Sequence, residues 1–385
     1  MPSEPTPVPR VAALDAMRGY AILGVVVAHV AQWTRPGSAW LTQFSANGAF
    51  GVQLFFVASA FALFLSNAAR RPTERRPVAD FFIRRFFRIA PMFYAGVVFF
   101  GAMGWYARLW APHGIGPAHV LLTVLFLHGW QPESINAVVP GGWSIATETS
   151  FYLLLPLLFR LVTTRARAGA FLVFTLALGP LMNAGLAPLL TPDYSPGLAY
   201  LGWNFRYFWI FGQLPVFACG IVLYFLERDS GAPSRRLGFA SLLGAGAVVA
   251  IFFHVTPPPI PPPFHVAAAY GLASLLFGLA LHHLPSRPLV NPPVVFLGKI
   301  SYSLYFVHFA VMQPGFIYWP AGLPLADPWR MPAACLLVLL VAAGISYLTY
   351  RWIELPGIGL GRRLVARLEA RALRKANGAG NPAPS

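Results

Sequence analysis

The sequence predicts an all-α, polytopic membrane protein with about ten transmembrane helices and one short re-entrant or interfacial helix. Of its 385 residues, 57% are hydrophobic and only 10% are charged, whereas about a quarter of the residues in a soluble domain are charged. Ten apolar runs reach the length of about 20 residues that a helix needs to cross a bilayer. The basic residues gather in short clusters between those runs, which is the pattern of a topology signal.

The ten predicted spans follow one another along most of the chain. They cover residues 13–33, 45–66, 86–106, 143–162, 169–190, 204–226, 237–255, 265–284, 299–319 and 331–353. An eleventh apolar piece, HVLLTVLFLHGW at 119–130, is too short to cross comfortably. We therefore expect this piece to be re-entrant or to lie at the interface.

The basic clusters predict the orientation of the spans. If the N-terminus is cytoplasmic and 119–130 does not cross, nearly all clusters fall on the cytoplasmic side, as the positive-inside rule requires. They are Arg70, Arg71, Arg75, Arg76, Arg84 and Arg85; Arg165 and Arg167; Arg228, Arg235 and Arg236; Arg287; and Arg362, Arg363, Arg367, Arg371, Arg374 and Lys375. A further crossing at 119–130 would put every later cluster on the wrong side.

This topology predicts three regions in a multi-pass protein of the cell inner membrane. Residues 1–10 form a cytoplasmic tail, residues 11–360 form the membrane domain, and residues 361–385 form a second cytoplasmic tail that is partly disordered. PPPIPPP at 257–263 is expected to be a stiff external connector. The N-terminal residues lack the pattern of a removable signal peptide.

Composition also argues against several function classes. The formal charge of +16 comes from clusters between apolar runs, so no nucleic-acid partner is expected. Cys219 and Cys335 lie inside apolar segments, which implies neither a disulfide framework nor a cysteine metal site. The histidines show no metal-ligand spacing beyond one adjacent pair, and we expect no metal. The motifs of P-loop ATPases, G-x-S-x-G hydrolases and H-E-x-x-H proteases do not occur.

The first predicted helix carries three ionisable groups in LDAMRGYAILGVVVAH at 14–29. The eleven residues from Arg18 to His29 turn the helix by about 1100°, which is within ~20° of the same face, and Asp15 shares that face. The two residues differ in height by roughly 16 Å. Because a charge at mid-bilayer costs roughly 3 kcal/mol or more, this stripe is expected to face a cavity. The alternative is a helix-end pair of Asp15 with Arg18, and a His29 that only packs.

A second polar constellation lies in GGWSIATETSFYLLLPLL at 141–158. Ser144 and Glu148 are four residues apart on one helical face, and Tyr152 follows one turn later. The proposed topology places Glu148 at a depth similar to that of His29, where a carboxylate would orient an imidazole and raise its basicity. The alternative is structural, because Ser144 with Glu148 nearly forms a capping box.

Two further segments combine aromatic and ionisable residues. FFIRRFFRIAPMFY at 81–94 holds Arg84, Arg85 and Arg88, which either bind phosphates from the cytosol or anchor the helix end. In KISYSLYFVHFAV at 299–311, tyrosines are typical of membrane interfaces, and the role of the histidine stays open. This segment contributes Tyr302, Tyr305 and His308.

Glu354 lies in RWIELP at the end of the last predicted span. It is a candidate supporting residue, and the nearby Pro356 either accompanies that role or simply stops the helix.

Taken in order, these segments resemble the membrane acyltransferase type 3 family of O-acyltransferases. The resemblance rests on LDAMRGYAILGVVVAH, FFVASAFALF, FFIRRFFRIAPMFY, GGWSIATETSFYLLLP, GKISYSLYFVHF and IELP. The single motifs are weak, but the ordered set with the arginine-to-histidine spacing is specific. The resemblance implies about ten transmembrane helices in the lipid bilayer. It also implies transfer of an acyl group, often acetyl, from cytosolic acyl-CoA to a hydroxyl of lipopolysaccharide, exopolysaccharide, another glycan or a small molecule.

The resemblance also implies roles for individual residues. Arg18 and His29 correspond to the family's arginine and histidine, and His29, Arg18 and Glu148 are the candidate catalytic residues. The donor-binding motif corresponds to Arg84, Arg85 and Arg88 with Ser59, and the Trp-Ser-Glu motif corresponds to Trp143, Ser144 and Glu148. The family's Ser-Gly-Phe reads Ser59-Ala60-Phe61 here.

The expected mechanism is deprotonation of the acceptor hydroxyl by His29, with Glu148 orienting the imidazole. Arg18 would steady the donor or the developing oxyanion. An acyl-histidine intermediate is the competing route. The alternative function is a proton-coupled secondary transporter or exporter that uses Asp15, His29 and Glu148 as a relay, but no repeated halves are evident in the sequence. Acceptor identity and protein partners stay open.

Overall fold

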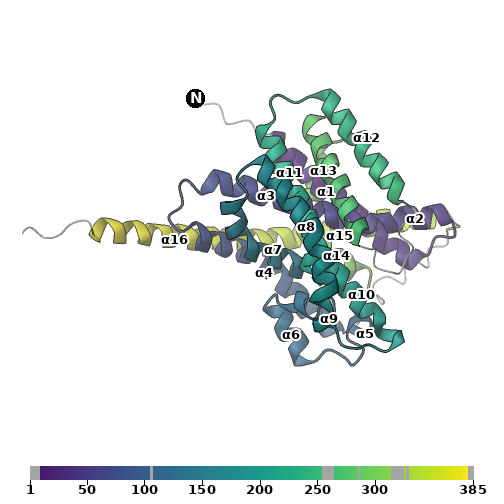
Figure 1. Cartoon of the computed structure of the whole chain (residues 1–385). Coiled ribbons are helices and arrows are strands. Elements are labelled where there is room, and N and C mark those ends of the chain that lie inside the picture. Colours follow the sequence, from purple (N-terminus) through teal and green to yellow (C-terminus); the bar gives the residue numbers. More distant parts are fainter. Residues whose placement is uncertain are drawn as a thin grey trace, which may run out of the picture.

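The computed structural model describes residues 9–104, 107–253, 264–284, 287–313, 325–326 and 329–379. Within these ranges every regular element is a helix, which confirms the predicted all-α class (Figure 1). The predicted connector 257–263 and the ends of the predicted spans at 106, 255 and 319 lie outside the described residues.

In the part of the chain that the structure describes, ten long helices build the bundle. Nine helical stretches in the described residues are long and apolar enough to cross a membrane, and α7, with 20 residues, adds a tenth of similar length that is more polar near its start. In chain order the long helices are α1 (Pro9–Thr34), α3 (Gly51–Arg70), α4 (Pro77–Met103), α7 (Gly142–Leu161), α8 (Arg165–Gly185), α11 (Ile210–Asp229), α12 (Arg235–Phe252), α13 (Phe264–His283), α14 (Pro292–Val311) and α15 (Arg330–Thr349).

Short helices fill the connections between the long ones. They are α2 (Ala39–Asn47), η1 (Gly48–Phe50), α5 (Ala107–Trp110), α6 (Pro117–Val124), η2 (His128–Trp130), α9 (Ala187–Leu190), η3 (Pro196–Leu198) and α10 (Ala199–Phe208). The apolar piece 119–130 therefore forms the eight-residue α6 and the three-residue η2. At 1.5 Å per residue α6 is about 12 Å long, far short of the ~30 Å bilayer core, so this piece forms no crossing helix, as predicted.

Hydrogen bonds gather the basic clusters at one end of the bundle. Arg71 at the end of α3 donates to the Phe159 carbonyl near the end of α7 (3.2 Å), and Arg228 in α11 donates to the Thr163 carbonyl just before α8 (3.3 Å). The Ser234 amide before α12 donates to Nδ1 of His283 at the end of α13 (3.0 Å). The helix ends that carry the arginines therefore meet at one face, as the predicted alternation of spans requires.

Helix α1 packs against α3, α13, α14 and α15 and runs through the middle of the bundle (Figure 1). Its contact with α14 is made backbone to backbone. A Cβ added to Gly298 would lie 1.8 Å from the Asp15 carbonyl oxygen, and one added to Gly19 would lie 2.1 Å from the Val294 carbonyl oxygen. These reciprocal contacts bring the two helices as close as small residues permit in membranes, and they set the register of the pair.

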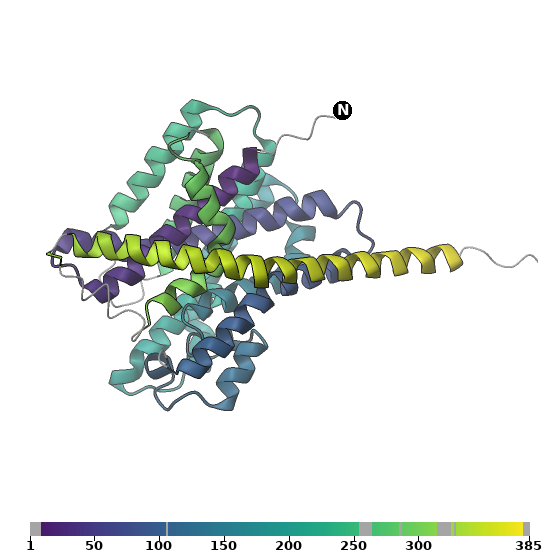
Figure 2. The same ribbon diagram turned by 180° about the vertical axis from the view of Figure 1, so that it is seen from behind.

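The last helix continues past the predicted end of the membrane domain. After α15 the chain forms the π-helical segment η4 (Tyr350–Glu354) and then α16 (Leu355–Ala379), so the interpretation that Pro356 stops the helix is wrong. Proline lacks an N–H and its ring clashes with the carbonyl four residues earlier, and the wider π turn accommodates this without a break. Figure 2 shows α15 and α16 crossing the back of the molecule as one rod.

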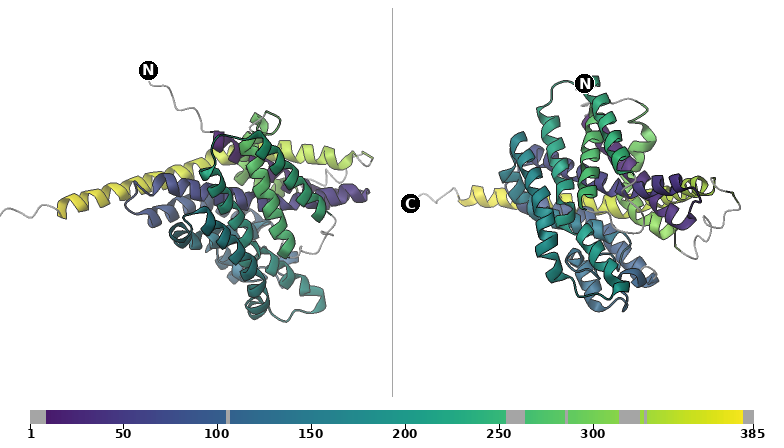
Figure 3. Two further views of the ribbon diagram at one scale, coloured as in Figure 1. Left: turned by 45° about the horizontal axis from the view of Figure 1, so that its top comes forward. Right: turned by 45° about the vertical axis from the view of Figure 1, so that its right-hand side comes forward.

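The described part of the expected tail at 361–385 is helical through Ala379, and residues 380–385 lie outside the described residues. Both views of Figure 3 show α16 extending beyond the bundle.

Replacing Gly298 with alanine is expected to destabilise the protein by about 2 kcal/mol or more, because one of two packed backbones must shift. The measurement is the folded fraction after heating, followed by size-exclusion chromatography in detergent. Gly344→Ala is the matched control, since a Cβ at this helical position meets nothing within 4 Å. Equal heat resistance of the two variants would contradict the importance of the α1–α14 contact.

Candidate functional site

A cavity of about 110 Å³ opens between α1, α3, α4, α7 and α14. It is large enough for several water molecules. The cavity collects most of the residues predicted from the sequence. Those that line it are Arg18, Ser59, Arg85, Arg88, Ser144, Glu148, Tyr152, Tyr302 and Tyr305.

Glu148 is held by hydroxyl groups inside this cavity. The Ser59 hydroxyl of α3 donates to its carboxylate, and so does the Tyr152 hydroxyl one turn later on α7 (2.7 Å). Arg85 lines the same cavity as Tyr152. In the described residues no hydrogen bond joins Glu148 to His29. We expected this carboxylate to orient the imidazole of His29, and in this structure it does not.

The capping interpretation of the α7 start is wrong. The N-cap residue is Gly141, which has no side chain to cap with, and the Ser144 hydroxyl donates to the Gly141 carbonyl (2.9 Å). Gly141 has φ +72°, and a Cβ there would lie 2.7 Å from the Tyr305 hydroxyl. Glycine is therefore required twice over, for the backbone conformation and for the approach of Tyr305.

His29 lies next to His308 rather than next to a carboxylate. Nδ1 of His29 is 3.1 Å from Nε2 of His308, and Nδ1 of His308 is 2.9 Å from the Leu304 carbonyl oxygen. A carbonyl only accepts, so His308 carries its proton on Nδ1 and accepts at Nε2 from His29. This assignment, inferred from the bonding pattern, leaves Nε2 of His29 as an unprotonated nitrogen.

Tyr305 connects the cavity to this histidine pair. Its hydroxyl donates to the Gly141 carbonyl (3.1 Å) and lies 3.0 Å from the Ser144 hydroxyl oxygen, both at the start of α7. Its ring centroid is 6.0 Å from that of His308, and the His29 ring packs on Phe309 at 4.6 Å. The two histidines therefore lie just beyond the end of the cavity that Tyr305 lines.

The three arginines predicted as one donor-binding group do not all face the same cavity: Arg85 and Arg88 line it, and Arg84 does not. Arg84 forms a two-pronged ion pair with Glu74 (2.6 and 3.0 Å). Arg85 lines the cavity, and Arg88 pairs with the fully buried Glu354. Arg84 and Arg85 diverge because adjacent residues on a helix differ by about 100° in direction.

Glu354 stands in the π turn of η4 and is held by two partners. It accepts from Arg88 and from the Ser303 hydroxyl of α14 (3.0 Å). The Arg88 guanidinium also lies over the Tyr302 ring, 5.8 Å from its centroid, while the Tyr302 hydroxyl donates to the Ile89 carbonyl (2.8 Å). The predicted supporting residues Tyr302 and Glu354 thus fix one arginine of the cavity wall.

The remaining predicted residues lie at the margins. Asp15 pairs with Arg18 at 3.5 Å, and Trp143 stacks on Phe208 with centroids 4.2 Å apart. Ala60, in place of the glycine of the family motif, directs its methyl group at α11, where a Cβ on Gly220 would be only 2.8 Å from it. The added methyl is therefore accommodated between helices, outside the cavity.

Sequence reasoning missed Ser301 and the apolar part of the cavity wall. Phe55 stands four residues before Ser59, Ser301 four before Tyr305, and Ile145 three before Glu148. Helical spacing from the polar residues already singled out would have found these three. The other missed lining residues are Val52, Phe56 and Ile89.

Comparisons with known proteins bear on what this site does. A family model described as an acyltransferase domain matches residues 11–350. The acyltransferase MdmB of Streptomyces mycarofaciens is 28% identical over 93% of this chain and 95% of its own length. The exopolysaccharide production protein ExoZ of Rhizobium meliloti is 29% identical over 84% of this chain and 95% of its own length.

The O-acetyltransferase OatA of Staphylococcus aureus is 24% identical over 89% of this chain and 56% of its own length. No solved structure matches. With the family model covering nearly all of the helical bundle that builds the cavity, the chain belongs to the acyltransferase 3 family and is a multi-pass membrane O-acyltransferase.

Proposed function

We propose that this enzyme transfers an acetyl group from cytosolic acetyl-CoA to a hydroxyl of a glycan or of a sugar-bearing small molecule. The observation that carries the proposal is the cavity, which has arginines in one part of its wall and Tyr305 in another. The His29–His308 pair lies just beyond Tyr305. In this proposal the basic helix ends face the cytosol and the protein resides in the inner membrane. The proposed acceptor class follows from the relatives, which include an exopolysaccharide production protein and an O-acetyltransferase.

The cavity supports binding of an extended anionic donor. Arg18, Arg85 and Arg88 present guanidinium groups to the cavity, and such groups form strong, directional hydrogen bonds with phosphates. Arg18 is separated from His29 by eleven residues of α1, or roughly 16 Å. Of the two roles considered for Arg18, this separation favours steadying the donor over stabilising the oxyanion.

Nε2 of His29 is the proposed general base. It removes the proton of the acceptor hydroxyl as the oxygen attacks the thioester carbonyl, so that a carbon–oxygen bond forms and the carbon–sulfur bond breaks. The departing thiolate then takes the proton from His29, which returns the imidazole to its starting state. The Ser144 and Tyr305 hydroxyls border this region. Either can stabilise the carbonyl oxygen as it gains charge by turning its one proton from the Gly141 carbonyl to that oxygen.

His308 is the proposed positioning residue for this base. By accepting the Nδ1 proton of His29 it fixes the tautomer that leaves Nε2 free, the task that a carboxylate performs in many catalytic triads. The carboxylate of Glu148 instead keeps Ser59 and Tyr152 in place. An acyl-histidine is the alternative use of the same nitrogen. Labelled acetyl retained on the denatured protein in the absence of acceptor would identify that route.

His29→Ala is expected to lower the transfer rate by roughly 10²- to 10⁴-fold, the usual contribution of a general base. The measurement is transfer of labelled acetyl from acetyl-CoA to glycans extracted from the source cells, normalised to folded protein in the membrane. His265→Ala, at an exposed position near the start of α13, is the control and should keep full activity. Unchanged transfer by the His29 variant would refute the catalytic assignment.

His308→Ala is expected to lower kcat by roughly 10- to 100-fold, as loss of a partner that orients a functional histidine typically does. The KM for acetyl-CoA should change little, because the arginines of the donor site are untouched. His308→Gln should recover part of the activity, since its side-chain oxygen can accept the same proton. A raised KM with an unchanged kcat would show that the histidine pair serves donor binding instead.

A further inference from the structure

A second, smaller pocket lies at the basic end of the bundle, where α3 ends and α4 begins. Ser66 and Arg70 of α3, Glu74 of the connecting loop, and Arg84 and Arg85 of α4 line it. Arg85 also lines the larger cavity. The two cavities therefore adjoin at this side chain.

The charges around this pocket are unbalanced. Arg70 experiences repulsion from Arg84, Arg85 and Arg362 of α16, and attraction from Glu74. Three guanidinium groups and one carboxylate line the pocket itself, while Arg362 adds a positive charge nearby and Asp80 and Glu369 add two carboxylates at the start of α4. The excess of positive charge along the pocket wall favours binding of a further anion there. Arg70 is oriented by its Nε–H, which donates to the Ser66 hydroxyl (3.2 Å).

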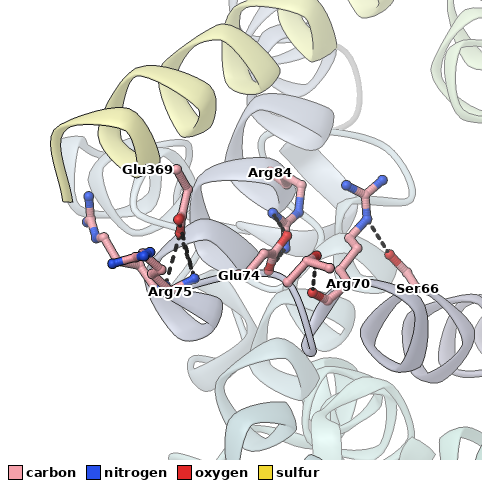
Figure 4. A network of polar contacts seen from close by, with 8 residues as sticks. Ser66, Arg70, Glu74, Arg75, Arg84 and Glu369 are labelled. Carbon is pink, nitrogen blue, oxygen red and sulfur yellow. Dashed lines mark hydrogen bonds and ion pairs between the residues drawn. The ribbon is translucent and has the colours of Figure 1, made fainter. Parts of the chain in front are cut away.

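Glu74 occupies the position that an incoming anion would take. Its two oxygens accept from the two Nη groups of Arg84, at 2.6 and 3.0 Å, and both side chains are largely buried, with 12% and 14% exposed. Figure 4 shows the carboxylate beside Arg84, with Arg70 and Ser66 on the other side. The two Nη groups of Arg84 that donate to this carboxylate can equally donate to two oxygens of a phosphate.

The loop that carries Glu74 allows the carboxylate to leave. Glu74 lies between the end of α3 at Arg70 and the start of α4 at Pro77. Close by, Glu369 of α16 accepts hydrogen bonds from the Arg75 and Arg76 amides (3.1 and 3.0 Å). Glu369 therefore binds the N-terminus of α4 independently of Glu74. If the Glu74 carboxylate leaves Arg84, the hydrogen bonds between Glu369 and the α4 N-terminus remain.

We propose that this pocket is a phosphate subsite for the nucleotide end of acyl-CoA, and that Glu74 holds the phosphate position until the donor binds. The inference rests on the proposed donor and adds Ser66, Arg70 and Glu74 to its binding site. A phosphate monoester carries about −1.5 to −2 charges at neutral pH, which balances the arginines better than one carboxylate does. The exchange is non-covalent: the phosphate replaces Glu74 in the ion pair with Arg84, and the Glu74 carboxylate turns to solvent.

The position of the pocket fits the length of such a donor. Arg70 and Ser59 are eleven residues apart on α3, or roughly 16 Å along the helix. An extended pantetheine arm that starts from the pocket and passes Arg85 therefore reaches the larger cavity beside Ser59 and Glu148. From there Tyr305 leads to the histidine pair.

Binding of CoA to the purified full-length protein tests the subsite without turnover. The assay uses the His29→Ala background in detergent free of anionic lipid. Arg70→Gln should weaken CoA binding about tenfold, the lower end of what a lost charge-assisted contact costs. Glu74→Gln should tighten it severalfold, because the competing anion is gone. Arg235→Gln removes an exposed arginine at the start of α12 and should leave the affinity within about twofold.

A second arm identifies which phosphate is bound. If the Arg70→Gln effect disappears with 3′-dephospho-CoA, the 3′-phosphate occupies the pocket; if the effect persists, the diphosphate does. Either result supports the proposal. A parallel measurement of CoA binding in nanodiscs that contain phosphatidylglycerol tests whether the pocket binds the phosphate of a lipid headgroup instead. An Arg70→Gln effect that appears only there would assign the pocket to lipid headgroups and overturn it.

The remaining outcomes separate this inference from the proposed function. Normal CoA binding that neither Arg70→Gln nor Glu74→Gln alters would overturn the subsite alone. Weaker binding and lower heat resistance in the Glu74 variant would show that the Glu74–Arg84 pair is purely structural, which also overturns it. Failure of the unmodified protein to bind CoA at all would overturn the proposed donor and this subsite together.

Discussion

The backbone contact between α1 and α14 is the constraint on which the rest of the site depends. Glycines at positions 19 and 298 let each helix receive a carbonyl oxygen of the other, so the pair has little freedom to slide. Ten residues after each glycine stand His29 and His308, which the same register brings to 3.1 Å. The close contacts at the two glycines therefore determine which side chain pairs with the His29 imidazole, more than two turns further along the helix.

Burial of charge in this bundle follows a consistent rule. Except for Arg85, each ionised group that lines the cavity has a partner of opposite sign or two hydroxyl donors: Arg18 with Asp15, Arg88 with Glu354, and Glu148 with Ser59 and Tyr152. Such pairing is needed because an isolated charge in an apolar surrounding is costly. The histidine pair differs, since two neutral imidazoles can share one hydrogen bond without any counter-ion.

Features that depend on a single helix could be predicted from the sequence. The spans, the shared face of Arg18 and His29, and the grouping of Ser144, Glu148 and Tyr152 all follow from helical periodicity. The partner of His29 could not be predicted, because it depends on the register between helices 279 residues apart. The same limit applies to the α7 start, where Ser144 and Gly141 meet Tyr305 of α14. The interpretation of Pro356 was wrong for a local reason, because the π turn of η4 accommodates the proline.

The continuity of α15, η4 and α16 has a mechanical consequence. Glu354 stands inside the rod, with a membrane helix on one side of it and the 25 residues of α16 on the other. No loop separates the projecting part from the carboxylate that holds Arg88. A displacement of α16 would therefore bear directly on the Glu354–Arg88 pair in the cavity wall, and also on α4, against which α16 packs.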